Sequence, residues 1–72
     1  MLRELTVQEV KNYPTDDFEV DKYLKEIAYL MESGRKIIVK EKYTAKGGCL
    51  NIYVYDANLY RYILSKSIDL NI

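Results

Sequence analysis

The side chains best suited to chemistry in this chain are the lysines and tyrosines of residues 36–55, KIIVKEKYTAKGGCLNIYVY. Aromatic rings that stack on bases, interleaved with ammonium groups that contact phosphates, are typical of single-stranded nucleic-acid platforms. The same residue types also form an ordinary solvated strand face, because Tyr favours strands and Lys discourages edge-to-edge pairing. In a third interpretation Ile38, Tyr53 and Tyr55 are too apolar for a free face and contact a helix or a partner. The segment therefore predicts a distinctive surface and leaves its use open.

No other group of residues is suited to catalysis or metal binding. The chain has no His and a single Cys, Cys49, so a nucleophilic thiol would lack its usual activating partner. The acidic residues 16–21 lack the glycine and the final Glu of an EF-hand loop, and helix capping accounts for them. Gly47 and Gly48 lack the spacing of a phosphate-binding loop. We expect a protein that is not an enzyme, with no catalytic residue, no metal site and no cofactor.

Composition narrows the function classes further. Seventy-two residues fit one small domain, residues 1–72, and a hydrophobic fraction of 49% indicates a folded chain. Eleven basic residues balance eleven acidic ones, which argues against both a generic nucleic-acid binder and an acidic mimic of DNA. The start, MLRELTVQEV, lacks the pattern of a secretory signal, and no apolar run approaches the ~20 residues of a membrane span. We therefore expect a cytoplasmic protein that does not bind membranes.

Two helices are predicted in the first half of the chain. Residues 6–9, TVQE, form a capping box, with Leu5 and Val10 as a hydrophobic staple, for a short helix from Val7 to Asn12 that Pro14 ends. A second helix runs from Asp17 to Ser33, where apolar residues recur at helical spacing. Thr15 or Asp16 is its expected cap, and Gly34 its left-handed stop.

A β-hairpin is predicted next, from strands Lys36 to Tyr43 and Cys49 to Tyr55. Its turn is either Gly47-Gly48 or a looser loop over residues 44–49. Both registers pair odd positions of the first strand with even positions of the second, so the faces are the same. The core face holds Ile37, Val39, Glu41, Tyr43, Leu50, Ile52 and Val54. The other face holds Lys36, Ile38, Lys40, Lys42, Cys49, Asn51, Tyr53 and Tyr55.

Glu41 interrupts the apolar core face, and a buried carboxylate without a partner is costly. We expect the hairpin tip to project beyond the core and leave Glu41 in water, with a lysine partner as the alternative.

The last part of the chain predicts a third helix and a strand. Asp56 or Asn58 caps a helix over roughly Ala57 to Lys66, and residues 67–72, SIDLNI, alternate like a strand. The expected fold is α+β: two N-terminal helices, a β-hairpin, a third helix and a short C-terminal strand completing a small antiparallel sheet.

Eight tyrosines in 72 residues exceed what a small core needs, and Tyr is enriched at interface hot spots. We expect a small interaction module that binds a larger protein or itself as a homodimer, a regulator or inhibitor of the kind that phages or mobile elements encode. The AT-rich codons behind its Lys, Ile, Tyr and Asn content suggest that origin. The alternative is a nucleic-acid-binding module that uses the same face. The expected contact residues are Lys40, Lys42, Tyr43, Tyr53, Tyr55 and Tyr60.

Overall fold

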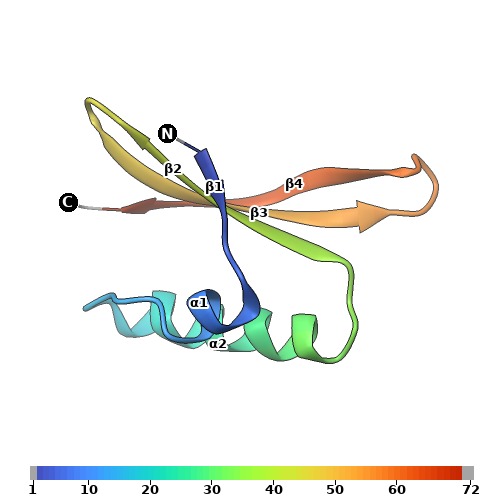
Figure 1. Cartoon of the computed structure of the whole chain (residues 1–72), viewed down its shortest axis with the longest axis horizontal. Helices are drawn as coiled ribbons and strands as arrows, with labels where there is room; N and C mark the ends of the chain where they lie inside the picture. The colour runs from blue at the N-terminus through green and yellow to red at the C-terminus, as the bar shows by residue number, and fades with distance from the viewer. Residues whose placement is uncertain (1, 71–72) are drawn as a thin grey trace.

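The structure is a computed structural model of the chain and describes residues 2–70. The order of elements is β1 (Leu2–Glu4), α1 (Val7–Lys11), α2 (Phe18–Glu32), β2 (Ile37–Thr44), β3 (Gly47–Asp56) and β4 (Arg61–Leu70). The strands form one antiparallel sheet in the order β1-β2-β3-β4. Both helices lie against one face of this sheet (Figure 1), which is termed the inner face; the opposite face is the outer face. None of the helices in residues 2–70 is long and apolar enough to cross a membrane.

The two N-terminal helices form as the sequence predicts, with small shifts of their ends. The capping box of α1 is present, because Thr6 Oγ1 accepts from the Glu9 N–H and the Glu9 carboxylate accepts from the Thr6 N–H. The cap of α2 is Asp17, whose side chain accepts from the N–H groups of Glu19 and Val20, so the expectation of Thr15 or Asp16 was wrong. Gly34 has the expected positive φ, +91°, and ends the helical path.

The β2–β3 hairpin has the predicted division of faces and a different turn. Ile37 pairs with Val54 and Val39 with Ile52, so odd positions of β2 oppose even positions of β3. The two-residue turn is Ala45-Lys46, flanked by the pair Thr44 and Gly47. Neither predicted turn is correct. Both predicted turns nevertheless pair odd positions of β2 with even positions of β3, so the residues were assigned to the correct faces of the hairpin.

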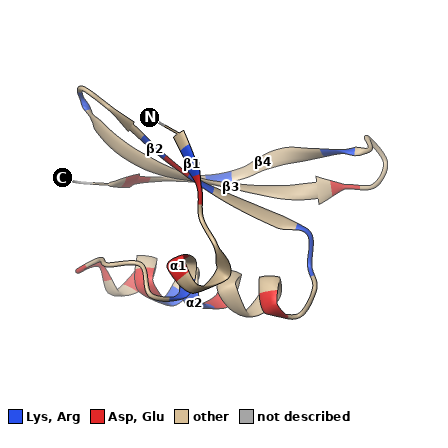
Figure 2. Ribbon diagram, in the orientation of Figure 1, with Lys and Arg blue, Asp and Glu red and all other residues tan. Residues whose placement is uncertain are grey.

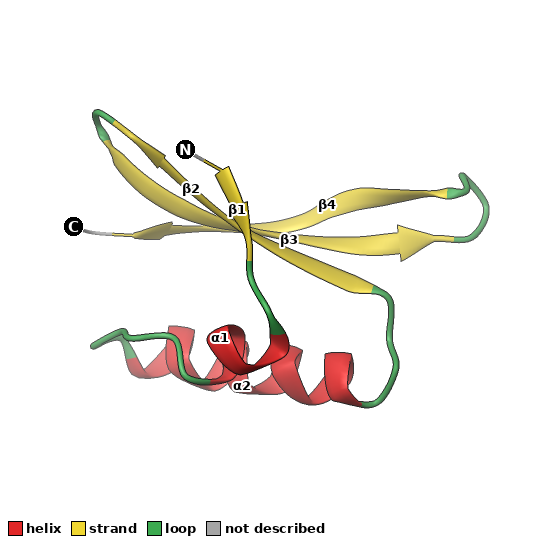
Figure 3. Cartoon of the chain, viewed as in Figure 1, coloured by secondary structure: helices red, strands yellow, loops and turns green. Residues whose placement is uncertain are grey.

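The core lies between the inner face and the helices. Leu24, Ile27 and Ala28 of α2 meet Val39, Leu50 and Ile52 of the sheet, together with Leu5, Val10 and Ile68. Figure 3 shows the two layers, helices below and strands above. Because both helices are on the same side, the outer face has no covering helix in the described part of the chain.

The predicted third helix is a strand, and the expected fold class is wrong on this point. Residues 57–60 form a turn, and β4 then pairs with β3 over ten residues, Arg61–Leu70. Asp56 Oδ1 accepts from the N–H groups of Asn58 and Leu59, the same bonds that a helix cap would make. Here they tighten a turn, and Tyr60, at φ 54°, reverses the chain into β4. The alternating tail belongs to this longer strand; its last two residues, 71 and 72, lie outside the described residues.

The structure also adds a strand that the sequence did not suggest, and this strand explains Glu41. β1 pairs with β2 so that Arg3 lies opposite Glu41, and its guanidinium donates to Glu41 Oε1 at 3.2 Å. Glu41 is only 6% exposed. Tyr13 Oη donates to Glu41 Oε2 at 2.5 Å and Tyr43 Oη at 2.9 Å. The expected projecting tip was therefore wrong, as was a lysine partner: Glu41 is buried and paired with an arginine and two phenols.

These contacts set the ionisation of the buried groups. Burial alone would raise the pKa of Glu41, but hydrogen bonds from Tyr13, Tyr43 and Arg3, with the charge of Arg3, outweigh it and hold the pKa below its ordinary value of 4.5. Burial and the bond to the Glu41 carboxylate raise the pKa of Tyr13. Glu41 is therefore charged and Tyr13 is a neutral donor at neutral pH.

This cluster predicts a specific acid sensitivity. The folded pKa of Glu41 is below the unfolded one, so its stabilising contribution is present above the unfolded value and is lost as pH falls through the folded value. At neutral pH, Glu41→Gln should lower the free energy of unfolding by about 1–3 kcal/mol. Urea unfolding between about pH 7 and pH 3 should show the difference from the native chain shrinking.

The matched control is Glu32→Gln at the exposed C-terminal end of α2, which should change the free energy of unfolding little at any pH. A Glu41→Gln deficit that stays constant down to pH 3 would contradict this account of the cluster.

Candidate functional site

The outer face is organised in four cross-strand rows that run from polar to aromatic. The pairing of β1, β2, β3 and β4 places these residues side by side. The rows are Leu2-Lys42-Cys49-Asp69, then Glu4-Lys40-Asn51-Ser67, then Ile38-Tyr53-Leu64, and finally Lys36-Tyr55-Tyr62. The first two rows are the polar half of the face, and the last two are its aromatic half.

Three side chains of the polar half hydrogen-bond to one another. Ser67 Oγ donates to Asn51 Oδ1 at 2.7 Å, and the Cys49 thiol donates to the same oxygen at 3.7 Å. Lys40 shares its row with the carboxylate of Glu4, and the row of Lys42 contains Asp69. Positive charge is thus interspersed with negative charge here, and no uniformly basic stripe forms.

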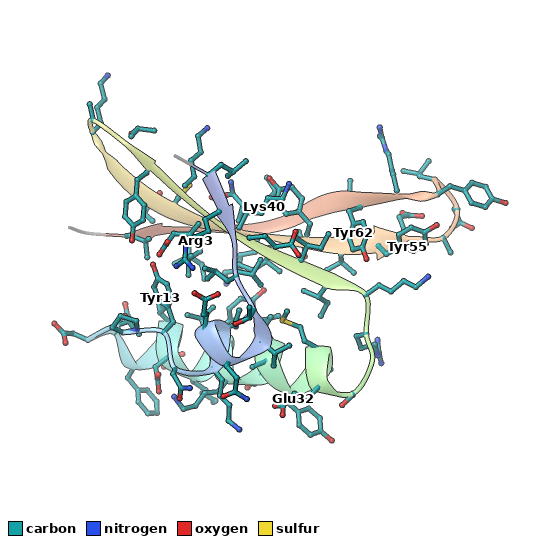
Figure 4. All side chains as sticks on the ribbon, in the orientation of Figure 1. Arg3, Tyr13, Glu32, Lys40, Tyr55 and Tyr62 are labelled. Atoms are coloured by element: carbon teal, nitrogen blue, oxygen red, sulfur yellow. The ribbon has the colours of Figure 1, made fainter. Side chains whose placement is uncertain are left out.

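Two lysines, Lys36 of the aromatic half and Lys40 of the neighbouring polar row, lie over tyrosine rings of the aromatic half. Lys36 Nζ is 4.8 Å from the centre of the Tyr55 ring, and Lys40 Nζ is 5.5 Å from that of Tyr53, both within the range of a cation–π contact. The rings of Tyr55 and Tyr62 meet edge to face, with centroids 5.3 Å apart. Figure 4 shows Lys40 on the side of the sheet away from the helices. The result is an ordered aromatic patch with ammonium groups beside it.

Four of the six predicted contact residues lie together on this face: Lys40, Lys42, Tyr53 and Tyr55. Tyr43 does not join them. It lies on the inner face, half-buried, with its hydroxyl on Glu41. Its ring also covers Gly48, where a Cβ would come within 2.7 Å of Tyr43 Cδ1. The chemistry of Tyr43 is therefore directed at its own fold.

Tyr60 is separate from the other predicted residues, in the turn between β3 and β4. It is 84% exposed and has a φ of 54°, a left-handed conformation that costs about 1–2 kcal/mol for a residue with a Cβ. A large aromatic side chain held in this position contributes little to the core. Strain of this kind is an observation from which a contact role can be inferred.

Sequence reasoning missed Tyr62 and Leu64, which complete the aromatic half from β4. They were assigned to a helix because Leu59, Tyr62 and Ile63 also fit helical spacing. The available signal was the run of Tyr, Ile and Leu in residues 60–64, which is rich in strand-favouring residues.

Two of the acidic residues at positions 16–21 have structural roles. Asp17 caps α2 and Asp21 pairs with Lys25 at 2.8 Å. Among residues 2–70, no group of Cys, Asp and Glu side chains is arranged to hold a metal ion.

Comparison of the chain with protein-family models, curated proteins and solved structures gives no match.

The strain at Tyr60 gives a stability prediction. Tyr60→Gly should raise the free energy of unfolding by about 1 kcal/mol, because glycine adopts a positive φ without a Cβ penalty and the lost side chain is almost fully exposed. Leu59→Gly, one residue earlier and also exposed, is the matched control and should not stabilise the chain. Thermal or urea unfolding of the native chain and the two variants measures these changes. Equal destabilisation by both substitutions would show that the backbone of Tyr60 is not strained.

Proposed function

We propose that this chain is a small non-enzymatic module that binds a larger protein through the aromatic half of its outer face. The observation that carries the proposal is a contiguous set of apolar and aromatic side chains, Ile38, Tyr53, Tyr55, Tyr62 and Leu64, on a sheet face without a covering helix in residues 2–70. Soluble monomers rarely leave such patches free of function. Tyrosine supplies large contact area with a polar tip, which is the character of interface hot spots.

Lysines complete this surface as a rim. Lys36 and Lys40 stand beside the tyrosine rings, and a polar rim around an apolar centre is the usual anatomy of a protein interface. Tyr60 is a further exposed aromatic side chain, in the turn between β3 and β4 and apart from this patch. A partner surface with apolar pockets and a few carboxylates would match this pattern.

The proposed biological role is that of a regulator or inhibitor acting in the cytoplasm, of the kind that phages or mobile elements encode. Small size, balanced charge and the AT-rich codons behind the Lys, Ile, Tyr and Asn content support it. A protein of this kind can act by covering a surface of its partner, and such a role requires no catalytic group.

Single-stranded nucleic acid is the second candidate, because Lys and Tyr side chains meet on one exposed sheet face as in stacking platforms. Two features disfavour it. Lys40 and Lys42 share their rows with carboxylates, and the chain has no net charge, whereas affinity for nucleic acid grows with the number of phosphates neutralised.

The test is affinity capture from a host lysate with the native chain and with the variant Tyr53→Ala/Tyr55→Ala. We expect a captured protein to be lost with the variant, since a hot-spot truncation costs about 2 kcal/mol or more per side chain. Tyr29→Ala is the matched control, since Tyr29 is 68% exposed on α2 and distant from the outer face. Capture that is the same with all three proteins would refute the proposal.

A second measurement separates the two candidates. Fluorescence anisotropy with a labelled single-stranded oligonucleotide should show no binding at about 50 mM salt if the partner is a protein. Binding that weakens steeply toward about 200 mM salt, and that Lys40→Ala reduces, would favour the nucleic-acid candidate instead.

A further inference from the structure

We propose that β4 is the interface of a symmetric homodimer, in which the β4 strands of two chains pair antiparallel and continue the sheet across the two-fold axis. This proposal does not rest on the function proposed above. It concerns backbone pairing along the edge strand β4, whereas the proposed function concerns side chains on the outer face.

The first observation is an open edge. β4 is ten residues long and pairs with β3 on one side, and no other strand of residues 2–70 lies along its second side. Alternate backbone N–H and C=O groups on that side are therefore available to another strand. The opposite edge of the sheet differs, because β1 covers the middle of β2.

Features that usually protect an open edge are weak here. β4 contains no proline and one lysine, Lys66, and Lys66 is turned to the inner side, with Nζ 4.6 Å from the ring centre of Tyr23. A bulge at Ser65, opposite Ile52 and Tyr53, is the remaining irregularity.

The second observation is that residues 62–64 of β4 are apolar on both faces. Tyr62 and Leu64 point to the outer face, while Ile63 shares the inner side with Val54 and is still 38% exposed. Among residues 2–70, nine large hydrophobic residues are exposed, and six of them lie between residues 54 and 64. In Figure 2 the β3–β4 hairpin is tan along most of this end, with a blue and a red segment beside the turn. A strand with two apolar faces is typical of the interior of a sheet and unusual at its edge.

The third observation concerns register. Because of the bulge, Ile63 and Ile68 face the same side although their numbers differ by five, an odd number. Two β4 strands related by a two-fold axis would pair antiparallel, with a residue before the bulge in one chain opposite a residue after the bulge in the other. Because the bulge shifts the alternation by one, such partners lie on the same face when the sum of their residue numbers is odd. The register that overlaps all ten residues, 61 with 70 through 64 with 67, has such a sum. Full overlap and matched faces thus coincide, which makes β4 self-complementary.

This register also provides cover for the exposed inner residues. Ile63 of one chain would lie beside Ile68 of the other, at a groove between α2 and β4 whose apolar lining includes Val20 and Tyr23. Arg61 would lie opposite Leu70, at a hollow lined by Asp16 and Asp17. The charges are therefore complementary at each end of the seam.

The centre of the seam brings the two Lys66 side chains near the axis. Each is already held over its own Tyr23, and Glu19 and Glu26 line the same groove. The lysines therefore have compensating groups on their own chains. The symmetric pairing would also join two outer faces into one continuous surface.

Sedimentation equilibrium of the full chain tests the proposal. We expect a dimer, and Ile63→Glu should raise its dissociation constant by about 100-fold, roughly tenfold for each of the two copies that symmetry creates. Tyr29→Glu on the exposed side of α2 is the control and should leave the constant unchanged. Circular dichroism establishes that both variants fold. A native chain that is monomeric up to about 1 mM overturns the proposal, as does a dimer that ignores Ile63→Glu.

Cross-linking tests the register independently of that variant. In a Cys49→Ser background, a chain with Leu64→Cys is mixed with a chain carrying Ser67→Cys and oxidised. The mixture should form a disulfide-linked heterodimer, because these positions are opposite each other on the outer face. Leu64→Cys with Asp69→Cys, two residues out of register on the same face, is the control and should link far less. Equal or greater linking in the control overturns the proposed register.

Discussion

The fold depends on the burial of one carboxylate, that of Glu41. A charge on the inner face is tolerated only if donors reach it. Two of its donors, Arg3 on β1 and Tyr13 after α1, come from distant parts of the chain, and the third, Tyr43, lies two residues along β2. Figure 4 shows Tyr13 reaching up from the helix layer toward the sheet, near Arg3. One side chain thus ties the first strand to the edge of β2 and holds the segment between the helices against the same end of the sheet.

Anchoring the helix layer at that end leaves the other end of the sheet uncovered. An α-helix rises 1.5 Å per residue, so the fifteen residues of α2 extend about 22 Å, whereas ten strand residues of β4 extend about 33 Å. The helix is too short to support the whole β3–β4 hairpin. Val54 and Ile63 show the consequence, because they lie on the inner side and are nevertheless 39% and 38% exposed. The uncovered apolar surface follows from a mismatch of lengths rather than from a defect in packing.

The sequence was most informative where a local pattern had one physical interpretation. The capping box of α1, the apolar stripe of α2 and the division of faces in the first hairpin depend on nearby residues and were predicted correctly. Three features that local sequence patterns do not decide were missed. β1 is only three residues long and is defined by its partner strand. The turn at Asp56 makes the bonds of a helix cap. Residues 57–66 fit both helical and strand spacing, and pairing with β3 decides between them. Because β1 was missed, the burial of Glu41 beside Arg3 was missed as well. Because residues 57–66 were assigned to a helix, Tyr62 was absent from the predicted site.

The replacement of the expected third helix by β4 changes the meaning of the tyrosines. In one interpretation of the sequence, a helix over residues 57–66 covers Tyr53 and Tyr55 with its apolar side. As a strand, the same residues are divided by alternation: Tyr62 and Leu64 join the outer face and Ile63 faces the inner side. Each face of the hairpin therefore gains apolar surface and neither gains a cover. The aromatic patch and the apolar edge arise together from this single difference in secondary structure, and within residues 2–70 nothing else removes these side chains from water.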